Sequence, residues 1–188
     1  MKNDYLAEFL PRRIGVPSDS NIEELLFCFE IVIAAKLPQS YTEFIKYYQS
    51  TIVFELDVCF HPLNATPWDK KDGTQDLELL YGIIHSDQNL HNAYKTYATR
   101  MPSSIIPIGE ASGGNLICLD VSNEHNCQVY FWDHENECLI TGSNKTDYNN
   151  LYLIAETFPD FLSRLQTKVG NTDKSGDGIV GVWLSDDL

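Results

Sequence analysis

The sequence predicts an α+β fold, in which amphipathic helices pack on a mainly antiparallel, twisted sheet. Apolar residues recur at the helical period in two early segments, 22–33 and 41–48. Residues 52–60 instead place large apolar side chains at every second position, as a strand with one buried face does. Two later segments rich in β-forming residues, 116–121 and 129–132, flank a polar turn and therefore indicate a hairpin.

Two consecutive helices are predicted after a short helix or arm at residues 1–17. Ser20 and Glu23 have the spacing of a capping box, in which each side chain pairs with an unpaired backbone N–H of the other residue. The inner face of this first helix follows the helical period: Ile22, Leu25, Leu26, Phe29 and Ile33. Pro38 begins the second helix, because proline is tolerated in a first turn. The inner face of the second helix is aromatic and aliphatic: Tyr41, Phe44, Ile45 and Tyr48.

Residues 52–60 form the first long strand, whose core face is predicted to be apolar throughout: Ile52, Phe54, Leu56, Val58 and Phe60. The opposite face carries Glu55 and Asp57, whose carboxylates are expected to point outward. Residues 61–76 are rich in turn-forming residues. We interpret them as an exposed excursion, because apolar segments resume directly afterwards. A strand and a third helix follow, with Ser86 as the predicted N-cap.

The centre of the fold is expected within residues 105–135, which contain the predicted hairpin. Gly113 and Gly114 allow the positive φ angles of a tight turn before it. Residues 151–155 are apolar enough for another strand, and a fourth helix follows in which Pro159 occupies the first turn. Its inner face repeats at the helical period: Phe158, Phe161, Leu162 and Leu165.

Length and composition suit one globular domain over residues 1–170, followed by a tail at 171–188, because 188 residues can bury a core without disulfides or metals. The 13 Lys and Arg residues against 27 Asp and Glu residues give a net charge of −14. This balance argues against nucleic acid or an anionic membrane as a partner and favours basic partners. Solubility alone would explain the charge equally well.

Five cysteines without a paired CxxC spacing, together with scattered charges near the N-terminus, point to reduced thiols in a cytoplasm. No apolar run reaches the roughly 20 residues of a membrane span.

Several short motifs occur in an order that resembles the SUKH superfamily. The order is Leu-Pro before an aromatic helix, then Ile-Pro-Ile-Gly-Glu, Gly-Gly-Asn, Ile-Cys-Leu-Asp and Tyr-Phe-Trp-Asp-His-Glu. The resemblance extends over about residues 14–168. The motif residues that it identifies as structural are Leu37, Pro38, Gly113, Gly114, Asp120, Trp132, Asp133 and His134. It implies a SUKH-like fold. Members include a fungal regulator of cell-wall synthesis (Smi/Knr), and bacterial members typically neutralise a toxin encoded beside them.

Metal sites are weakly indicated. The segment 173–184 begins like an EF-hand loop but has Leu184 where the bidentate Glu is required. Five residues near the hairpin are of zinc-ligating type: Cys118, His125, Cys127, His134 and Cys138. They lack the paired spacing of zinc sites, and free cysteine is commonly a small buried hydrophobe. We therefore predict no metal and no cofactor.

Catalytic patterns are also absent from the sequence. There is no Gly-x-Ser-x-Gly elbow, although a Cys-His dyad assembled in space stays open. Asp120 and Asp133 are of the type that glycosidases use, but acids at strand ends more often cap turns. The predicted protein is therefore a non-enzymatic binding protein.

The function implied by the resemblance is that of an immunity protein that binds a cognate toxin domain, with a basic nuclease as the expected target. An acidic surface would then occupy the groove that receives phosphates. The candidate contact acids are Glu55, Asp57, Asp69, Asp72, Asp76, Asp133, Glu135 and Glu137. For each acid alone, a solvated surface charge is the simpler interpretation. The alternative is a regulatory or scaffold module like the fungal members.

Overall fold

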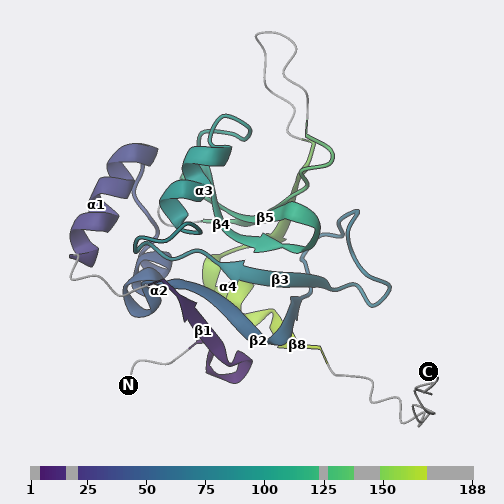
Figure 1. Cartoon of the computed structure of the whole chain (residues 1–188). Coiled ribbons are helices and arrows are strands. Elements are labelled where there is room, and N and C mark those ends of the chain that lie inside the picture. Colours follow the sequence, from purple (N-terminus) through teal and green to yellow (C-terminus); the bar gives the residue numbers. More distant parts are fainter. Residues whose placement is uncertain (1–4, 16–20, 123–126, 138–148, 169–188) are drawn as a thin grey trace, which may run out of the picture.

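An antiparallel sheet organises the structure, a computed structural model that describes residues 5–15, 21–122, 127–137 and 149–168 (Figure 1). Within these residues the sheet has eight strands: β1 (Pro11–Ile14), β2 (Thr51–Phe60), β3 (Gln75–Leu80), β4 (Ile105–Ala111), β5 (Asn115–Asp120), β6 (Val129–Trp132), β7 (Leu151–Ala155) and β8 (Leu165–Thr167). Strands β1 to β7 follow one another across the sheet in chain order, and β8 also pairs with β2. The predicted α+β fold with an antiparallel sheet is confirmed.

The described residues also form four α-helices: α1 (Ile22–Ile33), α2 (Gln39–Tyr48), α3 (Leu90–Tyr97) and α4 (Phe158–Ser163). Short 3₁₀ turns lie at Ala7–Phe9 and Ser112–Gly114. Helices α2 and α4 meet through aromatic rings, since the Phe158 ring centroid is 5.0 Å from that of Tyr41 and 5.1 Å from that of Phe44. The predicted inner face of α2 is therefore the face that it buries.

The middle of the sheet is buried on both faces, which explains why the hairpin sequence is apolar nearly throughout. Strands β5 and β6 pair as predicted, with Leu116 opposite Trp132. Alternate residues of β5 enter different clusters: Ile117 belongs to the large core, whereas Leu116 and Cys118 pack with Trp132 and Met101 in a second cluster. Side chains of one strand point alternately to opposite faces, so the hairpin joins the two clusters.

Two helix starts differ from the prediction. Asn21 is the N-cap of α1, and its side chain accepts a hydrogen bond from the backbone N–H of Glu23 at 3.1 Å. Ser20 lies outside the described residues. The predicted N-cap Ser86 is wrong: Asn89 caps α3, and the carbonyl of Ser86 accepts a hydrogen bond from the Asn89 side chain at 2.7 Å. Asx and Ser residues cluster before both helices, and all of them are favoured N-cap types, so the sequence alone does not single out the cap.

Both ends of the described chain contain strands that were not predicted. The N-terminal segment, expected as a short helix or arm, has one 3₁₀ turn and then β1, which begins at Pro11. Leu165 does not continue α4; it begins β8, which pairs with the end of β2. The tail at 171–188, which contains the EF-hand-like segment, lies outside the described residues.

Candidate functional site

The first two candidate acids lie on an interrupted edge of the sheet. Strand β1 pairs with β2 as far as Phe54, and β8 pairs with it from Val58 onward. Between these points lies the β2 break (Glu55, Leu56 and Asp57), whose three side chains are exposed. Leu56 is 38% exposed, so its predicted place in the core is wrong, because the register of β2 against β3 shifts along this stretch. Glu55 and Asp57 are available to a partner.

Acids of the 61–76 excursion mainly hold that loop together. Asp69 accepts hydrogen bonds from the Thr66 backbone N–H at 3.0 Å and from its hydroxyl at 2.9 Å. Asp72 accepts two hydrogen bonds from Thr74, one from its hydroxyl and one from its backbone N–H, and these lower the pKa of Asp72. Asp72 is nevertheless exposed, whereas Asp69 is half-buried.

Asp76 is the centre of an ion-pair cluster. Its carboxylate lies 2.5 Å from the ammonium of Lys70 and 2.6 Å from that of Lys168. Partial burial opposes ionisation of Asp76, but the hydrogen bonds and charges of Lys168 and Lys70 outweigh it and hold the pKa below its usual value. Because Lys168 directly follows β8, Asp76 connects the C-terminal end of the described chain to β3. Its charge is already compensated.

The hairpin acids serve different purposes. Asp133 is completely buried and accepts hydrogen bonds from the backbone N–H of Glu135 at 3.1 Å and from the Asn136 side chain at 2.7 Å. Glu137 forms a bidentate ion pair with Arg100, with distances of 2.5 to 3.0 Å. Glu135 is exposed. Of this group, Glu135 alone presents an exposed carboxylate.

The structure therefore divides the eight candidate acids into two sets. Those with half-buried or buried side chains bound to neighbouring residues are Asp69, Asp76, Asp133 and Glu137. Those with exposed side chains are Glu55, Asp57, Asp72 and Glu135. For Asp76 and Glu137 the partners include residues distant in the chain, Lys168 and Arg100, which sequence spacing does not reveal.

The motif residues build the hairpin from inside. Asn115 is fully buried, and its side-chain oxygen accepts a hydrogen bond from the backbone N–H of His134 at 3.1 Å. Gly113 and Gly114 both have φ of +78°, and side chains lie directly against them. A Cβ on Gly113 would be 2.9 Å from the ring of Trp68, and one on Gly114 would be 3.5 Å from the ring of His134. The positive φ angles favour glycine at both positions, and at Gly113 the Trp68 ring would also have to shift to admit a Cβ, whereas the distance at Gly114 is an ordinary contact.

Other motif residues are equally structural. Leu37 and Trp132 are buried hydrophobic residues, and Pro38 is buried at the start of α2. Asp120 accepts a hydrogen bond from the backbone N–H of Ser122 at 2.8 Å, as a turn cap does. Asp120 and Asp133 lie at opposite ends of the β5–β6 hairpin, so the structure does not bring them together as a carboxylate pair.

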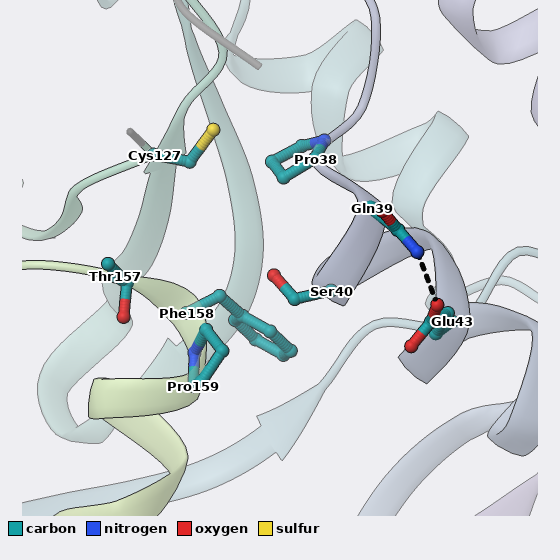
Figure 2. A pocket seen from close by; sticks show the side chains of 8 residues that line it. All are labelled: Pro38, Gln39, Ser40, Glu43, Cys127, Thr157, Phe158 and Pro159. Carbon is teal, nitrogen blue, oxygen red and sulfur yellow. Dashed lines mark hydrogen bonds between the residues drawn. The ribbon is translucent and has the colours of Figure 1, made fainter. Parts of the chain in front are cut away.

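A groove opens where α2 and α4 begin (Figure 2). It encloses about 410 Å³, and its lining comprises Pro38, Gln39, Ser40, Glu43, Cys127, Thr157, Phe158 and Pro159. The Gln39 side chain donates a hydrogen bond to Glu43 at 2.9 Å (Figure 2). A second depression of about 340 Å³ shares Ser40, Glu43, Phe158 and Pro159 with it. The Thr157 hydroxyl accepts the backbone N–H of Asp160 as the N-cap of α4, so it is committed to the fold.

The metal candidates are not assembled in the described part of the chain. No group of three or more His, Cys, Asp or Glu residues there is placed to hold a metal ion. Cys118 and Cys127 are buried, and burial raises the pKa of the Cys118 thiol, which therefore stays protonated. His125 and Cys138 lie outside the described residues.

One exposed surface was missed by the sequence reasoning. Phe27, Ile31 and Val32 of α1 are 57%, 63% and 49% exposed. The periodicity of α1 correctly identifies its inner residues, but the opposite face of the helix is apolar as well. The signal was present in the sequence, because Leu25–Ile33 contains one charged residue, Glu30. We call Phe27, Cys28, Ile31 and Val32 the outer face of α1.

Comparison with known proteins identifies a family and a bacterial relative. Residues 22–164 match the profile of the SMI1/KNR4 family (SUKH-1). The chain is also 37% identical over 177 residues to the SPbeta prophage-derived uncharacterized protein YokK of Bacillus subtilis (strain 168), a match that covers 89% of this chain and 86% of the relative. Among the described residues, no helix has the length and apolar character needed to cross a bilayer.

Proposed function

Because this chain belongs to the SMI1/KNR4 (SUKH-1) family, we propose that it is a non-enzymatic immunity protein that binds and neutralises a cognate bacterial toxin. Members of the family are generally non-catalytic immunity or regulatory proteins. The relative with 37% identity is bacterial and prophage-derived, which favours the immunity role over that of the fungal regulators. The target is a basic nuclease, which a protein with a net charge of −14 attracts.

The observation that carries this proposal is the exposed β2 break. Glu55 and Asp57 project from a strand whose backbone is fixed on both sides by β1 and β8. Because the backbone is already ordered there, binding Lys and Arg residues at this position does not require a loop to be ordered first. The other exposed acids, Asp72 and Glu135, extend the acidic surface.

A co-purification experiment tests the proposal. The tagged full chain is expressed together with the product of the adjacent reading frame, and the mixture is separated by size exclusion. We expect one equimolar complex and restored growth of cells that express the neighbouring protein. A neighbour that neither binds nor inhibits growth would contradict the immunity role and favour a regulatory or scaffold module with several weak partners.

A further inference from the structure

Helix α1 has two apolar faces, and the body of the protein covers one of them. Leu26, Phe29 and Ile33 point inward, where the Phe29 ring centroid lies 5.8 Å from that of Tyr94 and 6.1 Å from that of His91. Phe27 and Ile31 are one helical turn apart and lie on the opposite side of the helix. Figure 1 shows α1 at the periphery of the molecule, beside α3 and away from the strands.

The exposure of this face is unusual for a helix on a protein surface. Surface helices normally turn polar side chains to water, and a helix that is apolar all round is normally buried. Side chains as large as Phe27 and Ile31 are nevertheless 57% and 63% exposed, next to the partly exposed Val32. Contiguous apolar patches of this kind commonly mark protein–protein contacts.

We propose that the outer face of α1 is the apolar centre of a docking surface for a protein partner whose contact region is apolar in the middle and basic at its edge. The inference rests on the proposed function, since the partner meant is the toxin domain. It adds that binding energy comes from α1, whereas the acids of the β2 break mainly steer the encounter.

The charges around the outer face decide between possible occupants. Three acids and two lysines surround this face. Glu23 pairs with Lys46 at 3.2 Å, and Glu30 pairs with Lys36 at 2.5 Å. Lys36 also lies 5.8 Å from the ring centroid of Phe27. Glu24 is exposed at the N-terminal end of α1, so the rim carries one more negative than positive charge. A second copy of the chain would bring the same rim and a further net charge of −14, so two copies repel each other, whereas a basic partner is attracted.

A double substitution tests the surface. Phe27→Ala with Ile31→Ala is expected to weaken binding to the product of the adjacent reading frame by about 100-fold or more, because central apolar anchors dominate interface energies. Leu63→Ala is the matched control, because Leu63 is 40% exposed but lies on the 61–76 excursion. This variant should bind the partner as the wild type does. Because all three side chains are exposed, urea unfolding of each variant should match that of the wild type.

Cys28 supplies an independent readout. It lies on the outer face and is exposed, whereas Cys59, Cys118 and Cys127 are buried. Alkylation by N-ethylmaleimide, followed by mass spectrometry, should therefore modify Cys28 in the free protein, and bound partner should protect it. The modified protein should in turn bind the partner more weakly.

The outcomes separate this inference from the function on which it rests. Failure of the wild type to bind the neighbouring protein would overturn both. If the double variant binds as the wild type does, and Cys28 stays reactive in the wild-type complex, the α1 surface is overturned and the immunity role is left intact. Slow alkylation of Cys28 in the free monomer would show that the chain covers this face itself. If the wild type forms a dimer and the double variant is monomeric, a second copy of the chain occupies this face. Either of these two results would overturn the proposed partner.

Discussion

The side-chain oxygen of Asn115 accepts the backbone N–H of His134 at 3.1 Å and lies 3.2 Å from Nδ1 of the same residue. The contact joins the first residue of β5 to the residue two places beyond β6, across the hairpin at the centre of the sheet. The Asn115 amide nitrogen donates to the carbonyl of Ser112 at 2.9 Å. One fully buried side chain thus connects the glycine turn to the Trp-Asp-His motif.

The first prediction concerns this connection. Asn115→Ala removes the hydrogen bonds to the backbone N–H of His134 and to the carbonyl of Ser112, both on half-buried residues, so the free energy of unfolding should fall by about 2–3 kcal/mol. Urea denaturation followed by circular dichroism measures the change. Asn64→Ala is the control. Because Asn64 is exposed, this substitution should lower the free energy of unfolding by less than about 0.5 kcal/mol. Equal stability of the two variants would show that the Asn115–His134 contact contributes little.

The second prediction concerns electrostatic steering by the exposed acids. Reversing Glu55, Asp57 and Glu135 to Lys should slow association with a basic partner by about 10-fold or more at low salt, with little change in stability. Surface plasmon resonance measures the rate, and the difference should shrink at high salt.

A matched triple variant controls for total charge. Reversal of Glu8, Asp87 and Glu156, which are also exposed, changes the net charge equally but at other places. Association as slow in the control as in the test variant would mean that overall charge, and not the β2 break, determines the rate. Unchanged rates in both would remove the electrostatic part of the proposal.

The third prediction concerns acid stability. The pKa of Asp76 is held below its usual value in the folded protein, so its contribution to stability is complete above the unfolded pKa near 3.8 and is lost as the pH falls through the folded pKa. Asp76→Asn should therefore lower stability at pH 7 by about 1–2 kcal/mol, and the loss should diminish below about pH 4.

Urea unfolding at pH 7 and at pH 3 measures this difference. Asp72→Asn provides a comparison, because the pKa of Asp72 is also lowered, but by hydrogen bonds within its own turn and on an exposed group. Its effect at pH 7 should be smaller than that of Asp76→Asn. A stability loss for Asp76→Asn that is the same at both pH values would show that the lost ion pairs are not its cause.

Features that depend on residues close together in the chain were predicted correctly from the sequence, and features that depend on distant segments were not. The inner faces of α1 and α2 were correct because helical periodicity is a property of the segment itself. The exposure of the Leu56 side chain was not predictable in this way. Leu56 lies where the register of β2 against β3 shifts, between the end of the pairing with β1 at Phe54 and the start of the pairing with β8 at Val58. Strand β8 comes more than a hundred residues later in the chain.

The candidate acids illustrate the same limit. Asp133 and Glu135 are two positions apart and both carry a carboxylate, yet one is completely buried and the other exposed. Asp133 is buried because its carboxylate caps the turn that follows β6 and the Asn150 side chain donates to its backbone carbonyl. Such partners are visible only in the fold. The outer face of α1 is the opposite case. Its apolar residues are evident in the sequence, but the prediction considered only the face of the helix that packs on the core.

The last prediction concerns Arg100, which covers the second hydrophobic cluster. Its guanidinium forms the bidentate pair with Glu137 and lies 5.0 Å from the ring centroid of Trp132 and 5.1 Å from that of Tyr97. Arg100→Lys keeps the charge but loses the planar fork and the stacking, so stability should fall by about 1 kcal/mol. Glu137→Gln removes the charge of the partner and keeps a hydrogen-bond acceptor, so it should lower the free energy of unfolding by less than Arg100→Lys does. In 1 M salt the destabilisation by Glu137→Gln should shrink, whereas that by Arg100→Lys should persist. If Arg100→Lys is as stable as the wild type, the contact is only a solvated ion pair, and Trp132 needs no cation above it to stay buried.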